Sequence, residues 1–236
     1  MDTPWPDQPL AALDLETTGR DPATDRIVEL ALLLDRPGRP VEALVDTLVD
    51  PGAGVAISEG AAAVHGITRE RLIAEAAPPA AQVLSEVHRT LTRLAADGIG
   101  LVIFNATFDW PMLAAELARL DPPLALPPCQ LIDPLVIDRH VDRYRKGKRT
   151  LEAACGVYGI MLDDAHRASA DALASLGVAR AVGRSSFEVS GLDLGAMQDL
   201  QRTAHAAWRD SFNAYLARIG ADRGPVAGHW PGVFTG

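Results

Sequence analysis

The chain has 236 residues, of which 48% are hydrophobic and 22% charged, enough to bury the core of one large domain. Acidic side chains outnumber basic ones, 31 to 22, and the formal net charge of −9 argues against nucleic-acid binding through an overall positive charge. No apolar run approaches the length of a membrane span, the first residues do not resemble a secretion signal, and the two cysteines have no metal-binding spacing. We therefore predict a cytoplasmic protein with no membrane partner.

The first predicted element is a strand that begins at Ala11 and ends in a turn at Gly19. Side chains alternate between the two faces of a strand, so Asp14 and Glu16 point one way while Leu13 and Leu15 point the other. Two carboxylates on one face repel each other unless a cation lies between them, and hard divalent cations prefer oxygen ligands. The same pattern is also typical of a solvent-exposed strand. The other motifs of the chain therefore have to distinguish a metal site from an ordinary surface strand.

The segments that follow are strands first and then strands alternating with helices. Strands at 27–34 and 41–49 are separated by a Pro-Gly turn, which predicts an antiparallel pair. Further strands are expected at 101–104 and 131–132, and helices at 58–64, from 69, at 78–96, 108–120, 134–141, 150–158 and 168–183. This order predicts an α/β fold, with a mixed sheet and helices on both faces.

The C-terminal part differs in composition. Residues 184–191 are rich in Ser and Gly, which predicts a linker, so we divide the chain into a domain at 1–183 and a linker with a helical tail at 184–236. A helix is expected over 194–219. Its apolar stripe either packs on its own domain or binds a partner, such as a polymerase or a second copy of the chain.

Two further acidic motifs accompany the predicted strands. Asp109 comes just after the strand at 101–104, where ligand sites form in such sheets, although the start of a helix also favours an acid. Asp171 lies near the start of a predicted helix, and His166 lies in the loop leading into it, so both can face one point. His166 alone is equally typical of a surface or capping histidine.

Brought together, Asp14, Glu16, Asp109 and Asp171 would repel one another strongly without about two divalent ions. Such a pair of ions, roughly 3.5–4 Å apart, suits phosphoryl transfer. A histidine titrates near neutral pH, so His166 can act as the base that takes a proton from the attacking water.

Four motifs resemble, in the same order, those of the DEDDh (DnaQ-like) family of 3′–5′ exonucleases, which includes the epsilon proofreading subunit and ribonuclease T. They are Asp-Leu-Glu-Thr-Thr-Gly at 14–19, His-Gly-Ile-Thr at 65–68, Asn-Ala-Thr-Phe-Asp at 105–109 and His-Arg-Ala-Ser-Ala-Asp at 166–171. The resemblance covers about residues 8–183. It implies a ribonuclease H-like mixed five-stranded sheet in the order 3-2-1-4-5, flanked by helices, and two Mg²⁺ or Mn²⁺ ions.

The resemblance also implies roles for individual residues. Asp14, Glu16 and Asp171 would hold the ion that activates water, Asp14 would share the second ion with support from Asp109, and His166 would be the general base. Residues that would contact the terminal 3′ nucleotide or line its base and sugar pocket are Thr17, Thr18, Gly19, His65, Asn105 and Phe108. The chain has Phe104 where many members have histidine before the Asn-Ala pair, a departure that bears on Asn105 and its surroundings.

Basic residues are concentrated between positions 143 and 149, which include the only two lysines of the chain, Lys146 and Lys148. A charge run of this kind is usually a solvated loop. Here the rest of the chain is acidic, Gly147 adds flexibility and Tyr144 offers a ring for stacking, so we expect Lys146, Lys148 and Arg149 to bind phosphates.

These observations favour a metal-dependent enzyme that trims single-stranded nucleic acid from its 3′ end, with DNA as the preferred substrate and a role in repair or proofreading. One alternative is an exonuclease that trims RNA. Another is a non-catalytic docking subunit on the same fold.

Overall fold

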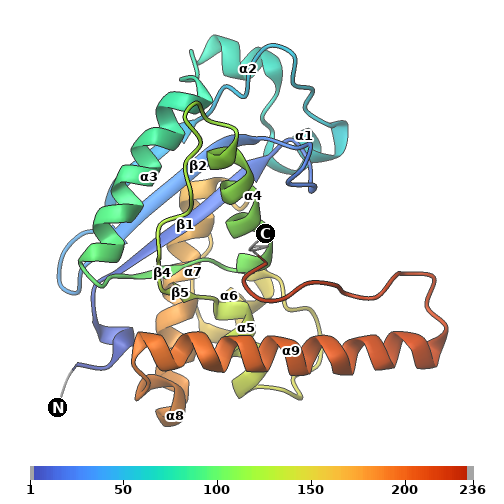
Figure 1. The fold of residues 1–236 in the computed structure, drawn as a ribbon. Coiled ribbons are helices and arrows are strands. Elements are labelled where there is room, and N and C mark those ends of the chain that lie inside the picture. Colours follow the sequence, from blue (N-terminus) through green and yellow to red (C-terminus); the bar gives the residue numbers. More distant parts are fainter. Residues whose placement is uncertain (1–2, 233–236) are drawn as a thin grey trace.

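The computed structural model describes residues 3–232, which fold around one mixed sheet. Its five strands are β1 (Leu10–Thr17), β2 (Ile27–Asp35), β3 (Glu42–Leu48), β4 (Gly100–Val102) and β5 (Leu131–Ile132). Their order is β3-β2-β1-β4-β5, in which β1, β2 and β3 pair antiparallel while β1, β4 and β5 pair parallel (Figure 1). The predicted ribonuclease H-like sheet and its strand order are therefore confirmed.

Helices cover both faces of this sheet, as the alternation of elements predicts. They are α1 (Glu59–His65), α2 (Arg69–Ala74), α3 (Ala80–Ala96), α4 (Ala106–Ala118), α5 (Pro134–Val141), α6 (Leu151–Tyr158), α7 (Ala168–Ser185), α8 (Phe187–Ser190) and α9 (Leu194–Ile219), with a short 3₁₀ helix at Trp5–Asp7. In the view of Figure 1, α3 lies in front of the sheet and α7 behind it. None of the helices in the described part of the chain is long and apolar enough to cross a membrane.

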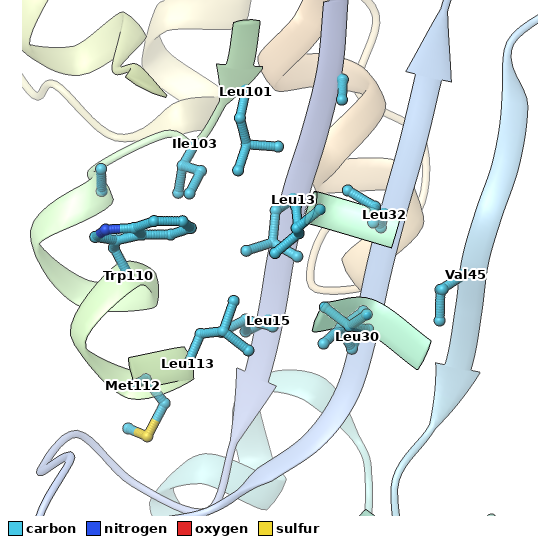
Figure 2. Close-up of a cluster of buried hydrophobic side chains, with 14 of the residues drawn as sticks. Leu13, Leu15, Leu30, Leu32, Val45, Leu101, Ile103, Trp110, Met112 and Leu113 are labelled. Carbon is cyan, nitrogen blue, oxygen red and sulfur yellow. The ribbon is translucent and has the colours of Figure 1, made fainter. Parts of the chain in front are cut away.

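The side chains of the central strand β1 pack alternately into two hydrophobic cores, one on each face of the sheet. Leu13 and Leu15 are buried with residues of α3 and α4, and Figure 2 shows them beside Leu30, Leu32 and Trp110. The even-numbered residues Leu10 and Ala12 are buried on the other face, against α7. Because Asp14 and Glu16 continue this even-numbered row, they also face α7, as the strand alternation predicts.

Several boundaries differ from the sequence expectations. Strand β4 ends at Val102, two residues early, because the chain turns through the left-handed conformation at Asn105 (φ 64°) into α4. Most of the expected linker at 184–191 is helical, since α7 continues to Ser185 and α8 follows. The reason is packing: Val189 is fully buried, and its carbonyl accepts a hydrogen bond of 2.9 Å from the indole N–H of Trp5. Ser and Gly composition does not reveal such a contact.

The helix α9 completes the open edge of the sheet. Strand β5 is the last strand, and its exposed backbone groups need partners. Gln201 is fully buried; its amide N–H group donates to Leu131 O (2.9 Å), and its amide oxygen accepts from Asp133 N (2.6 Å). Gln198 also donates to Leu131 O, at 2.6 Å. The first half of α9 therefore packs on its own chain.

The division of the chain at residues 183 and 184 stays a prediction. Residues 1–2 and 233–236, at the outer ends of the two expected segments, lie outside the described residues. Within the described part, the segment after α9 returns toward α4 and buries Trp230 in the same core as Leu13 (Figure 1).

Replacement of Gln201 by leucine should destabilise the protein. Leucine fills a similar volume but cannot accept the hydrogen bond from the backbone N–H of Asp133. Leaving this buried N–H without a partner costs about 1–3 kcal/mol. Urea unfolding of the two proteins measures this difference. Arg202→Ala is the matched control, because Arg202 is exposed on the same helix and should change stability by less than about 0.5 kcal/mol. An unchanged Gln201→Leu midpoint would contradict this role of α9.

Candidate active site

The carboxylates of β1 lie at the carboxyl end of the central strand, on the face covered by α7. Glu16 is opposite Glu29 in the β1–β2 register, and Asp14 is opposite Ala31. Both acids are only partly exposed. Their position at the end of a central strand, where parallel strands β1 and β4 meet, is where ligand sites form in α/β sheets.

The third motif brings an acid and a histidine to the same place. Asp171 lies in the first turn of α7, and its carboxylate accepts a hydrogen bond of 3.3 Å from the backbone N–H of His166. His166 has a left-handed backbone (φ 71°), which turns the loop toward the helix, and its side chain is exposed. One ligand atom from each of Glu16, His166 and Asp171 lies within 4.8 Å of the others. The loop and the strand therefore meet as the sequence predicts.

Asp109 is the most buried of the four predicted acids, with 4% of its surface exposed. It lies in the first turn of α4. Burial raises its pKa to about 8, partly offset by hydrogen bonds from backbone N–H groups, among them that of Leu15. Because Asp109 also raises the pKa of Asp14, the two carboxylates feel each other's charge and belong to one cluster.

The cluster is electrostatically unstable without positive charge. The pKa of Asp14 is raised well above its ordinary value by burial and then by repulsion from Asp109, Asp171 and Glu16. Burial and the same kind of repulsion raise the pKa of Glu16 to about 8 and raise that of Asp171.

The arrangement fits a divalent ion. The Asp171 oxygen Oδ1 is buried without a hydrogen-bond partner, and coordination to a bound cation would satisfy this oxygen. All four acids offer hard oxygen ligands, which Mg²⁺ and Mn²⁺ prefer.

Two residues that the sequence analysis did not select hold this cluster in place. Glu29 on β2 is 2% exposed and accepts hydrogen bonds of 3.2 Å from the guanidinium of Arg167 and from the backbone N–H of Ala168. These bonds fix the start of α7, which carries Asp171. The sequence pointed to Glu29 only as the one acid within the apolar run at 27–34.

Asp133 supports the second motif in a similar way. Its carboxylate accepts hydrogen bonds from the backbone N–H groups of Asn105 (3.0 Å) and Ala106 (2.9 Å) and from the indole N–H of Trp230 (3.0 Å). The left-handed turn that starts α4 therefore depends on an acid directly after β5. The signal in the sequence was an acid closing the short apolar run at 131–132.

The turn after β1 is braced by its own side chains. The Thr17 hydroxyl donates to Gly19 O (2.6 Å), and the Thr18 hydroxyl donates to the Asp25 carboxylate (3.0 Å). At Gly19 a Cβ atom would lie 2.5 Å from the same carboxylate, so any other residue would displace the Asp25 side chain from Thr18. His65 is buried and accepts from Ile67 N (3.0 Å), so its other ring nitrogen carries the proton and donates to Thr17 O (3.2 Å). Burial lowers the pKa of His65, which favours this neutral form.

The remaining predicted contacts divide into exposed and packed side chains. Asn105 is exposed at the start of α4, whereas Phe108 is partly buried and packs on the core. Phe104 packs against Ala154 and Cys155 of α6 and against residues of α7. The departure from histidine at this position therefore places an apolar contact between helices, and the substrate role of Asn105 stays a prediction.

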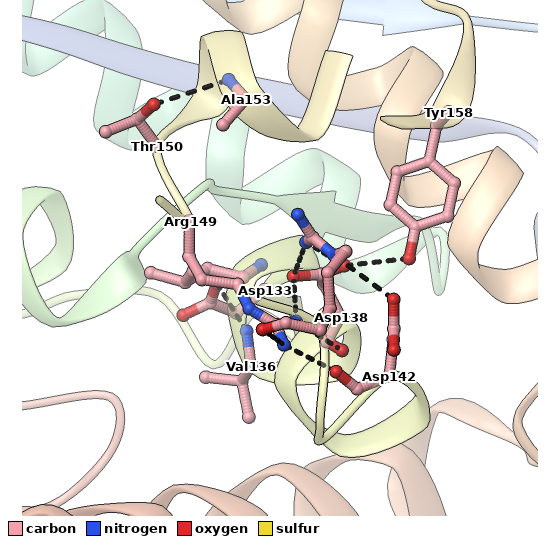
Figure 3. Close-up of polar contacts among 10 residues, drawn as sticks. Asp133, Val136, Asp138, Asp142, Arg149, Thr150, Ala153 and Tyr158 are labelled. Carbon is pink, nitrogen blue, oxygen red and sulfur yellow. Dashed lines mark hydrogen bonds and ion pairs between the residues drawn. The ribbon is translucent and has the colours of Figure 1, made fainter. Parts of the chain in front are cut away.

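The basic run splits into two groups. Lys146 and Lys148 are exposed on the loop between α5 and α6. Arg145 and Arg149 instead bind the Asp138 carboxylate, whose side chain is 1% exposed. Figure 3 shows Arg149 and Tyr158 on either side of Asp138. Burial alone would raise the pKa of Asp138, but hydrogen bonds from Arg145, Arg149 and Tyr158 lower it. Arg149 thus neutralises a buried acid, and phosphate binding by Lys146, Lys148 and Arg149 stays a prediction.

Comparisons with known proteins agree with this geometry. The exonuclease family model (RNase T) matches residues 11–179, more than half of the chain. The chain belongs to this exonuclease family. The resemblance to DnaQ-like DEDDh exonucleases is thereby confirmed. Among curated proteins, none matches the chain in sequence.

Solved exonuclease structures share the fold. E. coli exonuclease I in complex with a dT13 oligonucleotide is 22% identical, with a TM-score of 0.59 over 75% of this chain and 41% of that chain. Exonuclease X in complex with 5′ overhanging duplex DNA is 22% identical, with a TM-score of 0.58 over 81% and 99%. Exonuclease I in its SSB-Ct complex is 20% identical, with a TM-score of 0.62 over 78% and 42%. The chain therefore spans less than half the length of exonuclease I.

The stability of the metal-free protein should fall as the pH rises from about 4.5 to about 8. Glu16 and Asp109 keep their protons up to about pH 8 when folded, from ordinary values of 4.5 and 3.8, so the unfolded chain binds fewer protons in this window. Asp14→Asn removes one repelling charge and should reduce the fall. Urea midpoints measured in EDTA at both ends of the window test this, and excess Mg²⁺ should restore stability at the upper end. A wild-type curve as flat as that of the variant would contradict the clustering of these acids.

Proposed function

We propose that the protein is a metal-dependent 3′–5′ exonuclease that removes nucleotides from single-stranded DNA. The observation that carries the proposal is the cluster of Asp14, Glu16, Asp109 and Asp171, in which ligand atoms of Glu16 and Asp171 lie within 4.8 Å of each other and one oxygen of Asp171 is buried without a partner. Membership in the exonuclease family supports it. Two similar structures, exonuclease I and exonuclease X, hold a dT13 oligonucleotide and a 5′ overhanging duplex.

Two Mg²⁺ or Mn²⁺ ions, when bound, would supply the positive charge that activates water and stabilises the leaving oxygen. Glu16 and Asp171, from β1 and α7, would hold one of them together with Asp14. Asp14 and Asp109 would support the other. Because β1, α4 and α7 are each fixed by buried contacts, these oxygens are held in position before a substrate arrives.

His166 is proposed as the general base. Its ring lies beside Glu16 and Asp171 and is exposed, so it can take a proton from the attacking water and release it to solvent. Its backbone N–H donates to Asp171, and the next residue, Arg167, is bound to Glu29. These two contacts hold the loop so that the imidazole stays beside the carboxylates.

The polarity of the reaction is proposed from the turn after β1. Thr17 and Thr18 are buried, and their hydroxyls donate hydrogen bonds within the turn. The ring of His65 donates a further hydrogen bond to the Thr17 carbonyl. A rigid turn directly beside the carboxylates can close off the path beyond the terminal nucleotide. A site of this kind accepts a chain end and releases 5′-mononucleotides.

The polarity is tested with linear and circular single-stranded DNA in the presence of Mg²⁺ or Mn²⁺. A strand labelled at its 3′ end should lose the label at once as a mononucleotide, whereas a 5′ label should remain on progressively shorter products. Circles should remain intact because they offer no end. Cleavage of circles would indicate an endonuclease. Absence of cleavage of DNA, and of RNA of the same sequence, would favour the docking-subunit alternative.

Replacement of His166 by alanine should lower kcat by about 10²–10⁴-fold, because the water loses its proton acceptor. The KM for the oligonucleotide should change little, since the carboxylates and the Thr17 turn are intact. Steady-state assays at several oligonucleotide concentrations measure both. His88→Ala, on α3, is the control. A His166→Ala rate equal to wild type would exclude this base.

A further inference from the structure

A basic groove of about 950 Å³ lies between α5, the loop before α6 and α9. Its walls include Arg139, Arg143, Lys148, Arg223, Trp208 and Phe212. No acidic residue of the described part of the chain lines it, although the chain as a whole carries a net charge of −9. The groove is therefore a local concentration of positive charge on an acidic protein.

Much of this charge has no partner within the chain. Arg145 and Arg149 reach the groove but are bound to the buried Asp138. Among the described residues, Arg139, Arg143 and Arg223 form no ion pair with a carboxylate. Unpaired cations that converge on one cavity attract an anion, and the concave shape strengthens their field.

The α9 wall is aromatic. The rings of Trp208 and Phe212 are 5.5 Å apart and nearly parallel (12°), and Tyr215 continues the row at 6.2 Å from Phe212 (24°). Guanidinium groups lie over these rings: Arg139 is 3.8 Å from the centre of the Trp208 ring, and Arg223 is 5.6 Å from that of Phe212. Cations and aromatic rings thus lie together in the groove, and a nucleic acid strand offers a phosphate for the first and a base for the second.

The groove is connected to the active site through α5. This helix begins after Asp133, which holds the turn that leads to Asp109. Arg139 follows Asp133 by six residues, about 9 Å along a helix. The aromatic wall, by contrast, belongs to α9, outside the residues 11–179 that match the exonuclease family. The groove is therefore formed only in part by residues inside the span that the family model matches.

We propose that the groove binds single-stranded nucleic acid on the 5′ side of the end held at the carboxylates, with phosphates on Arg143 and Arg223 and bases against Phe212. The inference rests on the proposed function for its orientation. The aromatic row favours nucleic acid over an acidic peptide, because a peptide would use the cations but would gain little from parallel rings.

Binding is measured by fluorescence anisotropy of a labelled oligothymidylate with the full chain in EDTA, where no cleavage occurs. Arg143→Ala combined with Arg223→Ala should weaken binding about tenfold or more at low salt. It should also reduce the salt slope by about 1.4, or 0.7 for each phosphate contact to a single strand. Phe212→Leu should weaken binding about tenfold, and Phe212→Tyr should restore it.

The matched control for the charge change is Arg39→Ala combined with Arg89→Ala. Both residues are exposed and lie outside the groove, so this variant should bind as wild type does. Circular dichroism of each variant verifies that the helices are retained. The loss measured for the groove variants then reports on the groove itself.

Two results would overturn the inference. One is wild-type affinity in both the arginine pair and Phe212→Leu. The other is displacement of the oligonucleotide by polyglutamate at equal charge, with no effect of Phe212→Leu, which would make the groove a general anion site. The proposed function fails separately: a protein that binds the oligonucleotide through the groove but cleaves no linear strand in Mg²⁺ or Mn²⁺ would retain the groove and lose the exonuclease activity.

Discussion

The two-residue alternation of β1 is the constraint on which the rest of the structure depends. Leu13 and Leu15 are buried beneath α3 and α4, so Asp14 and Glu16 have to face α7. A shift of one residue in the pairing with β2 would bury both carboxylates in the core and expose two leucines. The register that forms the core therefore also forms the candidate active site, and neither can be changed without the other.

Local patterns were sufficient to predict the sheet and the residues gathered at its end. The alternation in β1 and the positions of Asp109 and Asp171 at the starts of helices are short-range features, which a sequence displays directly. The supporting contacts are different. Glu29 is 138 residues from Arg167, and Asp133 is 97 residues from Trp230. No periodicity links such distant positions, so the sequence marks these acids only as polar residues in apolar surroundings.

The basic run shows why charge in a sequence is not the same as available charge. Its residues look equivalent in the sequence, yet Arg145 and Arg149 both form ion pairs with a single buried acid, Asp138. Removing that acid would leave two partly buried guanidiniums close together, which is costly. The cations that remain free come partly from elsewhere, from α5 and from the segment after α9, and only the folded chain brings them together.

The hydrogen bond between Trp230 and Asp133 has a consequence for the order in which a nascent chain matures. Asp133 fixes the turn at Asn105, but its indole partner is synthesised 97 residues later. A chain still emerging from the ribosome can therefore form the sheet while one bond beneath Asp109 is missing. Only after the segment that carries Trp230 has been synthesised can this bond form, so the turn at Asn105 gains its full support later than the sheet does.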